Sequence, residues 1–564
     1  MIPAASYSHG TTQAELIGQT IGDYFDEQVE RHAEREAVVD PKKGVRLTYR
    51  QLGDQALQLA RGLMALGVAP GERVGIWSPN RWEWIVTQFG TPKIGTILVN
   101  VNPSYRLREL SYALRQSGIR TLITAPGFGP SDYLGMLHDL LGDLGPGPIA
   151  HPDFPDLREI VVLADAAPSG MRTLAELMRL GEQVTVEEVQ LRQSVVQFDE
   201  PVNIQYTSGT TGLPKGATLS HHNLLNNGYF IGELMRFTPE DRLCIPVPFY
   251  HTFGMVLANL ACLTHGAAMI IPGEGFDAGQ VLATVEAERC TALHGVPTMF
   301  IAELGHPDFA RYDLGSLRTG LMAGSPCPVE VMRQVQSRMH MSEVEIAYGM
   351  TETSPVSTQT RADDPIELRV GTVGRVHPHV EVKIVDPATG RVVPRGTTGE
   401  LVTRSYAVML GYWQNPEATA QVIDAARWMH TGDLAVMRED GYVNIVGRIK
   451  DMIIRGGENI YPREIEEFYY THPKVADIQV IGVPDQKYGE QIMAWIRLKP
   501  GETATDEEMR DFARGQIAHF KIPRYIKFVD SFPMTVTGKV QKYIMRDMAV
   551  KEFGLESAAG EKMA

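Results

Sequence analysis

The most informative stretch of this sequence reads Tyr206-Thr207-Ser208-Gly209-Thr210-Thr211-Gly212-Leu213-Pro214-Lys215-Gly216. It follows an apolar run, residues 202–206, which predicts a strand that ends in a loop. Glycines let backbone N–H groups converge on a ligand, hydroxyl groups add hydrogen-bond donors, and the lysine adds a positive charge. The stretch therefore predicts a loop that binds an oligophosphate, with a flexible linker as the alternative. A Walker A loop is excluded, because that motif needs Gly at Pro214 and Ser or Thr after Lys215.

The composition is that of an ordinary globular protein, with 43% hydrophobic and 21% charged residues among 564. This length predicts about three or four structural units. The net charge of −15 argues against general affinity for nucleic acid or for an anionic membrane. The four cysteines contain no C-x-x-C pair, which favours a reducing compartment and indicates neither a zinc site nor a disulfide framework.

No targeting or membrane-spanning segment is predicted. Residues 1–16 lack a cationic segment followed by an apolar core, so we expect no secretory signal. The best membrane candidate, residues 255–271, is interrupted by Asn259 and by the polar stretch Thr264 to Gly266, which favours a buried core segment. We expect a cytoplasmic protein with no transmembrane segment.

Helical and strand patterns alternate along the first part of the chain, which implies parallel sheets with helices on their faces. The predicted helices are 52–66, 82–89, 110–115, 220–235 and 281–288, and the predicted strands are 73–77, 96–100, 121–124, 243–248 and 292–295. Residues 126–155, rich in Gly and Pro, predict a surface excursion.

The last third changes in character. Short alternating strands from 380 to 402 suggest a small β subdomain, and Asp440-Gly441 predicts a hairpin turn. After a boundary near residues 447–451, a compact α+β unit is expected. Its predicted elements are a helix that starts at Pro462, strands at 478–483 and 492–498, and a capping box from Thr505 to Glu508.

Several other segments carry candidate functional groups. Glu352 follows a strand and is a candidate Mg²⁺ ligand, because a carboxylate repels phosphates unless a hard cation lies between them. Asp433 could accept both hydroxyl groups of a ribose. When each residue is taken alone, the structural interpretation is favoured: Glu352 as a solvated loop residue, Lys539 as a surface lysine, and His251 as a packed histidine among aromatic side chains.

Five ordered segments together resemble the core motifs of the adenylate-forming (AMP-binding) superfamily, which includes acyl-CoA synthetases, peptide-synthetase adenylation domains and luciferases. They are 206–216, 348–352, 430–433, 447–466 and 533–542, so the resemblance covers nearly the whole chain. The wording of residues 450–462, Lys450-Asp451-Met452-Ile453-Ile454-Arg455-Gly456-Gly457-Glu458-Asn459-Ile460-Tyr461-Pro462, is similar to the medium-chain fatty acyl-CoA ligase branch.

This resemblance implies an α/β fold with a large N-terminal domain of parallel αβ sheets plus a small β subdomain, followed by a small mobile α+β C-terminal domain. The implied domains are 1–447 and 453–564, joined by a hinge at 448–452. Lys450 stands at the hinge position, where many relatives carry Asp, so an argument from an acidic hinge does not apply to this chain.

The implied reaction joins a fatty acid to coenzyme A with ATP. The carboxylate, already ionised because its pKa is about 4, attacks the α-phosphate and forms an acyl-adenylate, so this step needs charge neutralisation rather than a base. The thiol of coenzyme A then displaces AMP; we identify no base for that thiol. The implied ligands are ATP, Mg²⁺, coenzyme A and a small carboxylic acid, and homodimer formation stays open.

The resemblance also implies roles for individual residues. Around the β- and γ-phosphates of ATP, the implied residues are Thr207, Ser208, Gly209, Thr210, Thr211, Gly212 and Lys215. Thr351 and Lys539 would contact the α-phosphate, and Asp433 and Arg448 would bind the ribose. The residues along the nucleotide would be Ala323, Gly324, Ser325, Pro326, Tyr348, Gly349 and Met350. Glu352 is the implied Mg²⁺ ligand. Lys539, Glu352, Thr351 and His251 form the implied catalytic set, with His251, Gly349 and Met350 at the edge of the acyl pocket. Gly456 and Gly457 would line the tunnel for coenzyme A.

Three alternatives remain open. The first is a ligase for an aryl or other hydrophobic acid. The second is a stand-alone adenylation enzyme that loads a carrier protein, although no carrier domain is visible after Lys542 and the sequence His221-His222 to Asn226 lacks the Asp of a condensation-domain motif. The third is a non-catalytic nucleotide-binding relative, which is disfavoured because the charged residues of the motifs are all present.

Overall fold

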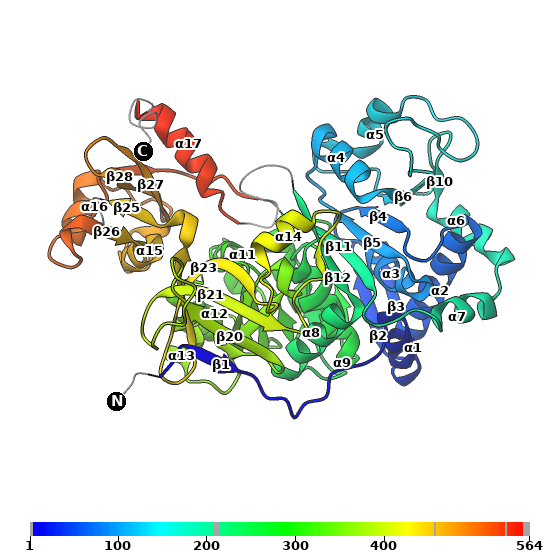
Figure 1. Ribbon diagram of the computed structural model, residues 1–564, viewed down its shortest axis with the longest axis horizontal. Coiled ribbons are helices and arrows are strands. Elements are labelled where there is room, and N and C mark those ends of the chain that lie inside the picture. Colours follow the sequence, from blue (N-terminus) through cyan, green and yellow to red (C-terminus); the bar gives the residue numbers. More distant parts are fainter. Residues whose placement is uncertain (1–3, 208–213, 326, 456–457, 536–538, 556–564) are drawn as a thin grey trace.

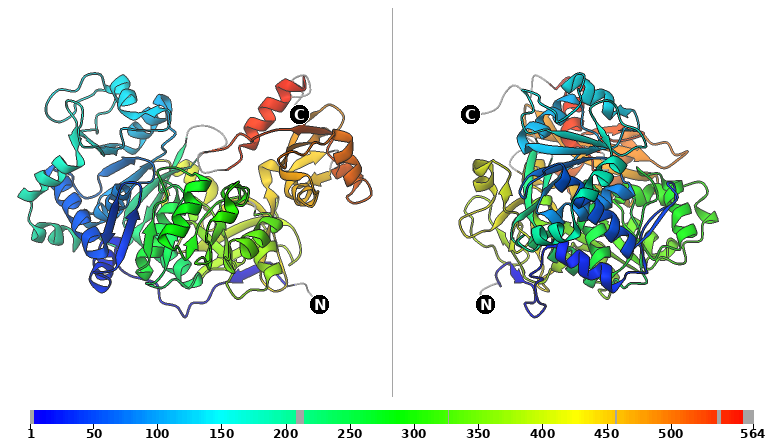
Figure 2. Two further views of the ribbon diagram at one scale, coloured as in Figure 1. Left: turned by 180° about the vertical axis from the view of Figure 1, so that it is seen from behind. Right: turned by 90° about the vertical axis from the view of Figure 1, so that its right-hand side faces the viewer.

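The computed structural model describes residues 4–207, 214–325, 327–455, 458–535 and 539–555. Two lobes are visible (Figure 1), and the opposite view and the side view in Figure 2 show the same division. The large lobe contains the two long sheets and a smaller antiparallel sheet. The small lobe is formed by the chain after residue 452 and lies beside the smaller sheet, far from α4 and α5.

The first long sheet has eight strands in the order β10-β9-β6-β4-β5-β11-β12-β22. These strands are β4 (Arg73–Trp77), β5 (Ile97–Val101), β6 (Ile119–Thr124), β9 (Glu159–Val162), β10 (Arg172–Thr173), β11 (Pro201–Thr207), β12 (Lys215–Ser220) and β22 (Gly411–Tyr412). The predicted parallel arrangement is confirmed from β10 to β11. At one edge, β12 and β22 run antiparallel to their neighbours. β12 does so because a short loop returns the chain antiparallel to β11, the strand it leaves.

The second long sheet has nine strands in the order β19-β18-β17-β16-β15-β13-β14-β2-β3. They are β2 (Glu36–Asp40), β3 (Val45–Thr48), β13 (Arg242–Cys244), β14 (Ala268–Ile270), β15 (Ala292–Leu293), β16 (Thr319–Ala323), β17 (Glu343–Gly349), β18 (Val356–Gln359) and β19 (Arg375–Val376). β16 and β17 are parallel, so their carboxyl ends, Ala323 and Gly349, lie at the same edge. That edge is where α/β sheets bind ligands.

Helices cover these two sheets, as the alternating pattern predicts. Their bounds are α1 (Ile21–Arg31), α2 (Tyr49–Ala65), α3 (Trp82–Gly90), α4 (Leu107–Ser117), α5 (Tyr133–Leu141), α6 (Leu174–Leu180), α7 (Val186–Gln193), α8 (His221–Leu234), α9 (Ala261–His265), α10 (Ala278–Glu288), α11 (Pro297–Leu304), α12 (Val329–Arg338) and α13 (Ile366–Gly371). Helix α5 lies inside the expected surface excursion. Its Tyr133 is fully buried and stacks on Trp77 with ring centroids 3.8 Å apart, so the middle of that excursion belongs to the core.

The apolar stretch after His251 is a core segment, as predicted. Phe253–Leu260 forms a π-helix that continues into α9, and every residue of that π-helix is buried. Among the helices of the described residues, none combines the length and the apolar character needed to cross a membrane.

The predicted β subdomain is a five-stranded sheet in the order β1-β20-β21-β23-β24. Its strands are β1 (Tyr7–His9), β20 (Val380–Val385), β21 (Gly399–Ser405), β23 (Met429–Met437) and β24 (Val443–Arg448). Helix α14 (Pro416–Val422) precedes β23 in the chain and packs against β22 and β23. The subdomain therefore extends well beyond residues 380–402 and includes the N-terminal strand. The predicted hairpin at Asp440-Gly441 joins β23 to β24, and Gly441 has a φ of +83°.

The small lobe is an α+β unit with its own core, as predicted. It contains β25 (Ile453–Arg455), β26 (Glu458–Ile460), β27 (Val475–Asp485), β28 (Gly489–Leu498), β29 (Tyr525–Phe528), α15 (Pro462–Tyr470), α16 (Asp506–Ala513) and α17 (Lys542–Glu552). Pro462 occupies the start of α15, and the Thr505 hydroxyl accepts a hydrogen bond from the Glu508 N–H at 3.2 Å, which is one half of the predicted capping box. Arg448 ends β24, and a 3₁₀ turn, Ile449–Asp451, follows it; the domain bounds and the hinge stay predictions.

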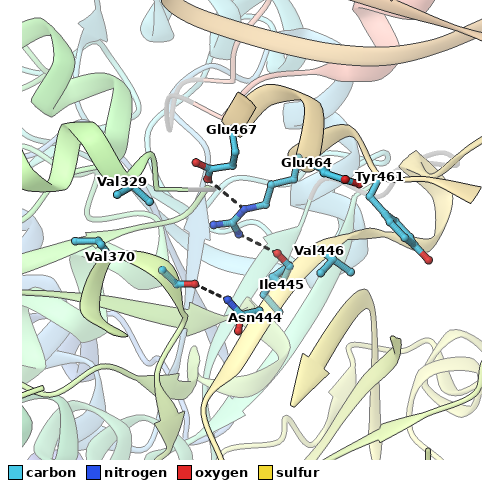
Figure 3. A pocket seen from close by; sticks show the side chains of 10 residues that line it. Val329, Val370, Asn444, Ile445, Val446, Tyr461, Glu464 and Glu467 are labelled. Carbon is cyan, nitrogen blue, oxygen red and sulfur yellow. Dashed lines mark hydrogen bonds and ion pairs between the residues drawn. The ribbon is translucent and has the colours of Figure 1, made fainter. Parts of the chain in front are cut away.

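The two lobes meet between α15 and β24. A cavity of about 320 Å³ lies there, with Val329 and Val370 on its large-lobe side and Tyr461 and Glu467 on its small-lobe side (Figure 3). The Arg463 guanidinium donates a hydrogen bond across the junction to the Ile445 carbonyl at 3.0 Å. None of the residues that line this cavity belongs to the predicted catalytic or nucleotide-binding residues.

Candidate active site

The expected phosphate loop joins two antiparallel strands at the edge of the first sheet. Thr207, at the end of β11, pairs with Lys215, at the start of β12, and the Thr207 hydroxyl donates to the Lys215 carbonyl at 3.4 Å. Residues 208–213 lie outside the described residues, and so do the predicted contacts of Ser208, Gly209, Thr210, Thr211 and Gly212. The structure therefore fixes the two ends of the loop.

Glu352 lies just beyond the end of β17, in the 3₁₀ turn Thr351–Thr353. Its side chain is buried, and one carboxylate oxygen, Oε1, accepts a hydrogen bond from the Tyr412 hydroxyl at 2.8 Å. Among the described residues, no partner hydrogen-bonds the other oxygen, and no group of three or more metal-ligating side chains occurs. One carboxylate suits Mg²⁺ that is held mainly by substrate phosphates and water.

Tyr412 connects Glu352 to the phosphate loop. The Lys215 ammonium lies 5.2 Å from the centre of the Tyr412 ring, within the range of a cation–π interaction. Burial, with the neighbouring Glu352 carboxylate, raises the pKa of the Tyr412 hydroxyl far above its usual value, so the phenol stays protonated and donates. Sequence reasoning missed this residue, because a tyrosine between Gly411 and Trp413 is indistinguishable from an ordinary core aromatic.

Three predicted nucleotide residues meet in one cluster. Asp433 Oδ2 accepts a hydrogen bond from the Tyr348 hydroxyl at 2.7 Å, and Asp433 Oδ1 lies 2.8 Å from Arg448 Nε. Asp433 and Arg448 are direct partners across the β23–β24 hairpin, which explains how residues from two separate motifs come together. The cluster fixes the direction of a buried carboxylate, which is what recognition of a ribose requires.

Glu400, on β21, supports the turn that presents Asp433. Its two carboxylate oxygens contact His430 Nδ1 at 2.9 Å and the Gly432 N–H at 3.1 Å. Gly432 has a φ of +69°, a conformation that glycine adopts without strain. Glu400 is a second residue that the sequence did not single out, since nothing in its neighbourhood indicates a contact thirty residues away.

Lys539 belongs to the small lobe yet lies beside the Asp433 cluster. The positive charge of Arg448 is the largest cause of a lowered pKa for Lys539, to about 8, with burial and Lys450 acting in the same direction and Asp433 opposing them. Lys539 keeps an open surface to solvent, so we attribute the shift mainly to the two neighbouring cations. The structure thus brings the candidate catalytic lysine and the candidate hinge lysine to the nucleotide cluster.

His251 faces the same region. Burial, followed by the charge of Lys539, lowers the pKa of His251 to about 4, so the imidazole is neutral at pH 7. Its Nδ1 accepts a hydrogen bond from the Phe253 N–H at 3.1 Å, which places the ring proton on Nε2. A neutral imidazole at this point can line a pocket or donate one hydrogen bond, but it supplies no positive charge.

The remaining predicted residues lie at the sheet edge. Ala323 ends β16, Gly324 follows with a φ of +88°, and Ser325 is half-buried. Met350 packs against the large core, next to Thr351. Pro326, Gly456 and Gly457 lie outside the described residues. Among the described residues, the site therefore forms two neighbouring groups, one around Glu352, Tyr412 and Lys215 and one around Asp433.

Comparison with known proteins identifies the family. Residues 25–413 match the family described as AMP-binding enzyme, and residues 464–539 match its C-terminal domain. The chain is 50% identical over 548 residues to a Bacillus subtilis protein provisionally named acyl-CoA synthetase YngI, covering 97% of this chain and 100% of that protein. It is 41% identical over 562 residues to the mitochondrial medium-chain acyl-CoA ligase ACSF2 of Homo sapiens, covering 98% of this chain and 91% of the relative.

A solved structure agrees with this assignment. The crystal structure of the anthranilate CoA ligase AuaEII in complex with anthranoyl-AMP is similar at a TM-score of 0.85 and 28% sequence identity, covering 96% of this chain and 99% of that chain. Sequence, fold and the order of the motifs lead to the same result. The chain belongs to the AMP-binding enzyme family.

Proposed function

We propose that this enzyme is an ATP-dependent fatty acyl-CoA ligase that acts on medium-chain acids through an acyl-adenylate and releases AMP and pyrophosphate. One observation carries the proposal: Lys539, from the small lobe, lies beside the paired Asp433 and Arg448 of the large lobe. A cation next to a ribose-binding carboxylate stands where the α-phosphate of ATP would follow the ribose. The names of the relatives support the choice of substrate class.

In the first half-reaction, Asp433 would orient the ribose and Lys539 would neutralise charge that develops on the α-phosphate. Loss of one such electrostatic contact typically costs about 10²–10³ in rate. Thr207 and Lys215 would hold the β- and γ-phosphates, and Thr351 would contact the α-phosphate. The carboxylate substrate arrives ionised, so the neutral His251 is a wall of the acyl pocket rather than a base.

Glu352 would hold Mg²⁺, which supplies the positive charge that the phosphates need as pyrophosphate departs. The donor set fits this ion, because Mg²⁺ in nucleotide sites is held by one or two carboxylates together with phosphates. Glu352 contributes one carboxylate that is buried and already oriented by a hydrogen bond.

In the second half-reaction, the thiol of coenzyme A would attack the adenylate. We infer that the small lobe rotates about residues 448–452, so that Lys539 leaves and Gly456 and Gly457 approach the adenylate. The cation pair Arg448 and Lys450 would favour this departure, because both disfavour a third positive charge at Lys539.

The second candidate is a ligase for an aryl acid, which the similarity to an anthranilate ligase favours. The test measures pyrophosphate release and thioester formation across straight-chain acids of increasing length and a set of aromatic acids. We expect the highest kcat/KM for straight-chain acids of medium length. A panel in which only aromatic acids react would overturn the fatty-acid assignment, and pyrophosphate release with no acid at all would overturn the ligase assignment.

A further inference from the structure

Tyr412 lies between two charged groups that come from distant parts of the chain. Its hydroxyl donates to Glu352 Oε1 at 2.8 Å, and the Lys215 ammonium lies 5.2 Å from its ring centre. Glu352 follows β17 of the second long sheet, whereas Lys215 begins β12 of the first. Tyr412 is therefore a direct side-chain link between Lys215, at the end of the phosphate loop, and the candidate metal ligand Glu352.

The backbone holds Tyr412 tightly in this position. β22 pairs with β12, so that Tyr412 lies opposite Ala217. On either side of it, the Leu410 N–H donates to the Thr218 carbonyl at 2.9 Å and the Trp413 N–H donates to the Gly216 carbonyl at 2.7 Å. Tyr412 thus moves with the strand that leaves the phosphate loop.

The same segment also holds the backbone around Glu352. The Met409 N–H donates to the Glu352 carbonyl at 2.9 Å, and the Ser354 hydroxyl donates to the Ala407 carbonyl at 2.7 Å. Residues 407–412 therefore clamp the turn that carries Glu352 onto the sheet that carries Lys215. The phenol completes this arrangement by orienting the carboxylate itself.

The orientation of the Glu352 carboxylate matters for metal binding because this charged group is buried. Glu352 is only 5% exposed and Tyr412 only 8%, and a buried carboxylate needs a hydrogen-bond donor to remain charged. The phenol donates to one oxygen and leaves the other available. A donor that fixes a metal-binding carboxylate typically strengthens metal binding as well as orientation.

We propose that Tyr412 is a positioning residue for ATP: its hydroxyl aims the Glu352 carboxylate at the divalent cation, and its ring holds the Lys215 ammonium toward the phosphates. The inference rests on the proposed function, because it takes Glu352 as the Mg²⁺ ligand. It concerns binding of the metal–nucleotide complex and does not add a chemical step.

A second buried tyrosine–carboxylate hydrogen bond, between Tyr442 and Asp364, provides a comparison for the one between Tyr412 and Glu352. Tyr442, in the β subdomain, is also buried, at 6% exposure, and its hydroxyl donates to the Asp364 carboxylate. Among the described residues, its hydrogen-bond and ring contacts include neither Lys215 nor Glu352. Removal of that hydroxyl leaves the nucleotide groups untouched. Tyr442→Phe is therefore a matched control for Tyr412→Phe, because each deletes one buried phenol–carboxylate hydrogen bond.

The experiment measures binding of α,β-methylene-ATP by calorimetry, once with Mg²⁺ and once with EDTA. For Tyr412→Phe, we expect the affinity in EDTA to match that of the wild type, while the factor by which Mg²⁺ tightens binding falls by about tenfold. For Tyr412→Leu, which also removes the ring, the affinity in EDTA should fall too, because Lys215 loses its support. Tyr442→Phe should keep both values.

The outcomes separate this inference from the proposed function. Wild-type pyrophosphate release with fatty acids is measured first, and its absence would refute the function itself. If the wild type is active and Tyr412→Phe keeps the full Mg²⁺ effect, the positioning role is wrong. An equal loss in Mg²⁺ and in EDTA for Tyr412→Phe would also refute it, since that pattern indicates general damage.

Discussion

At the scale of single residues, Lys539 carries the sharpest pH dependence. Its pKa of about 8 lies below the usual lysine value mainly because Arg448 is close. In the proposed mechanism, the charged form would stabilise the α-phosphate, so adenylation would be favoured below this pKa and lost as pH rises through it. We predict that kcat/KM for ATP, measured as pyrophosphate release without coenzyme A, falls about tenfold per pH unit above pH 8.

The control for this prediction is Lys539→Arg. A guanidinium stays charged throughout this range, so its kcat/KM should be lower near pH 7 but flat through pH 9. Lys539→Ala should lose adenylation by about 10²–10³ at every pH. An alkaline decline that persists in Lys539→Arg would assign the titration to another group.

The sequence predicted some residues of the candidate site but not Tyr412. Tyr348, Asp433 and Arg448 were predicted for one ligand, and Asp433 contacts both of the others. Tyr412 was not predicted, because its role depends on a ring face toward Lys215 and a hydroxyl toward Glu352. Those directions follow from the pairing of β22 with β12, which no local pattern encodes.

At the scale of elements, the end of β17 decides where Glu352 lies. A Cβ atom at Gly349 would stand 1.8 Å from the Pro355 carbonyl oxygen, a backbone atom that cannot move alone. We predict that Gly349→Ala lowers the free energy of unfolding by about 1–3 kcal/mol and displaces the Glu352 turn. A lower melting temperature, together with weaker Mg²⁺-dependent nucleotide binding, would show both effects.

Gly447→Ala on β24 is the matched control. A Cβ atom there would meet the Tyr461 ring at 3.7 Å, an ordinary contact, so stability should change little. Equal stability of the two variants would contradict the close approach of β17 to residue 355.

Elements were predicted best where the pattern is local. The alternation of β4, α3 and β5 is visible in the sequence because each element buries its own apolar residues. The antiparallel edge of β12 and β22 was not, because β22 is only two residues long and is ordered by a partner almost two hundred residues away. Helix α5 was missed because glycines and prolines surround it.

At the scale of the whole molecule, we expect activity to depend on the orientation of the small lobe relative to the large one. Lys539 lies near Arg448 of the other lobe, and the two lobes contact each other where α15 packs against β24 and Arg463 donates to the Ile445 carbonyl at 3.0 Å. The Arg463 guanidinium also lies 3.5 Å from the carboxylate of Glu467 on the same helix, and this ion pair orients the guanidinium. Arg463 also lines the neighbouring cavity, so its hydrogen bond to the Ile445 carbonyl crosses the junction beside that space.

Arg463→Ala should therefore shift the orientation of the lobes rather than unfold either of them. One hydrogen bond contributes about 1 kcal/mol net, so we predict that pyrophosphate release falls about fivefold. Thioester formation from supplied acyl-adenylate should stay unchanged or rise, because the proposed second orientation does not use this contact. Lys521→Ala is the control, since it removes an exposed ion pair to Glu464 of the same helix that lies wholly within the small lobe. If both half-reactions fall together in Arg463→Ala, or if Lys521→Ala gives the same imbalance, the contact between Arg463 and Ile445 does not set the orientation in which Lys539 acts.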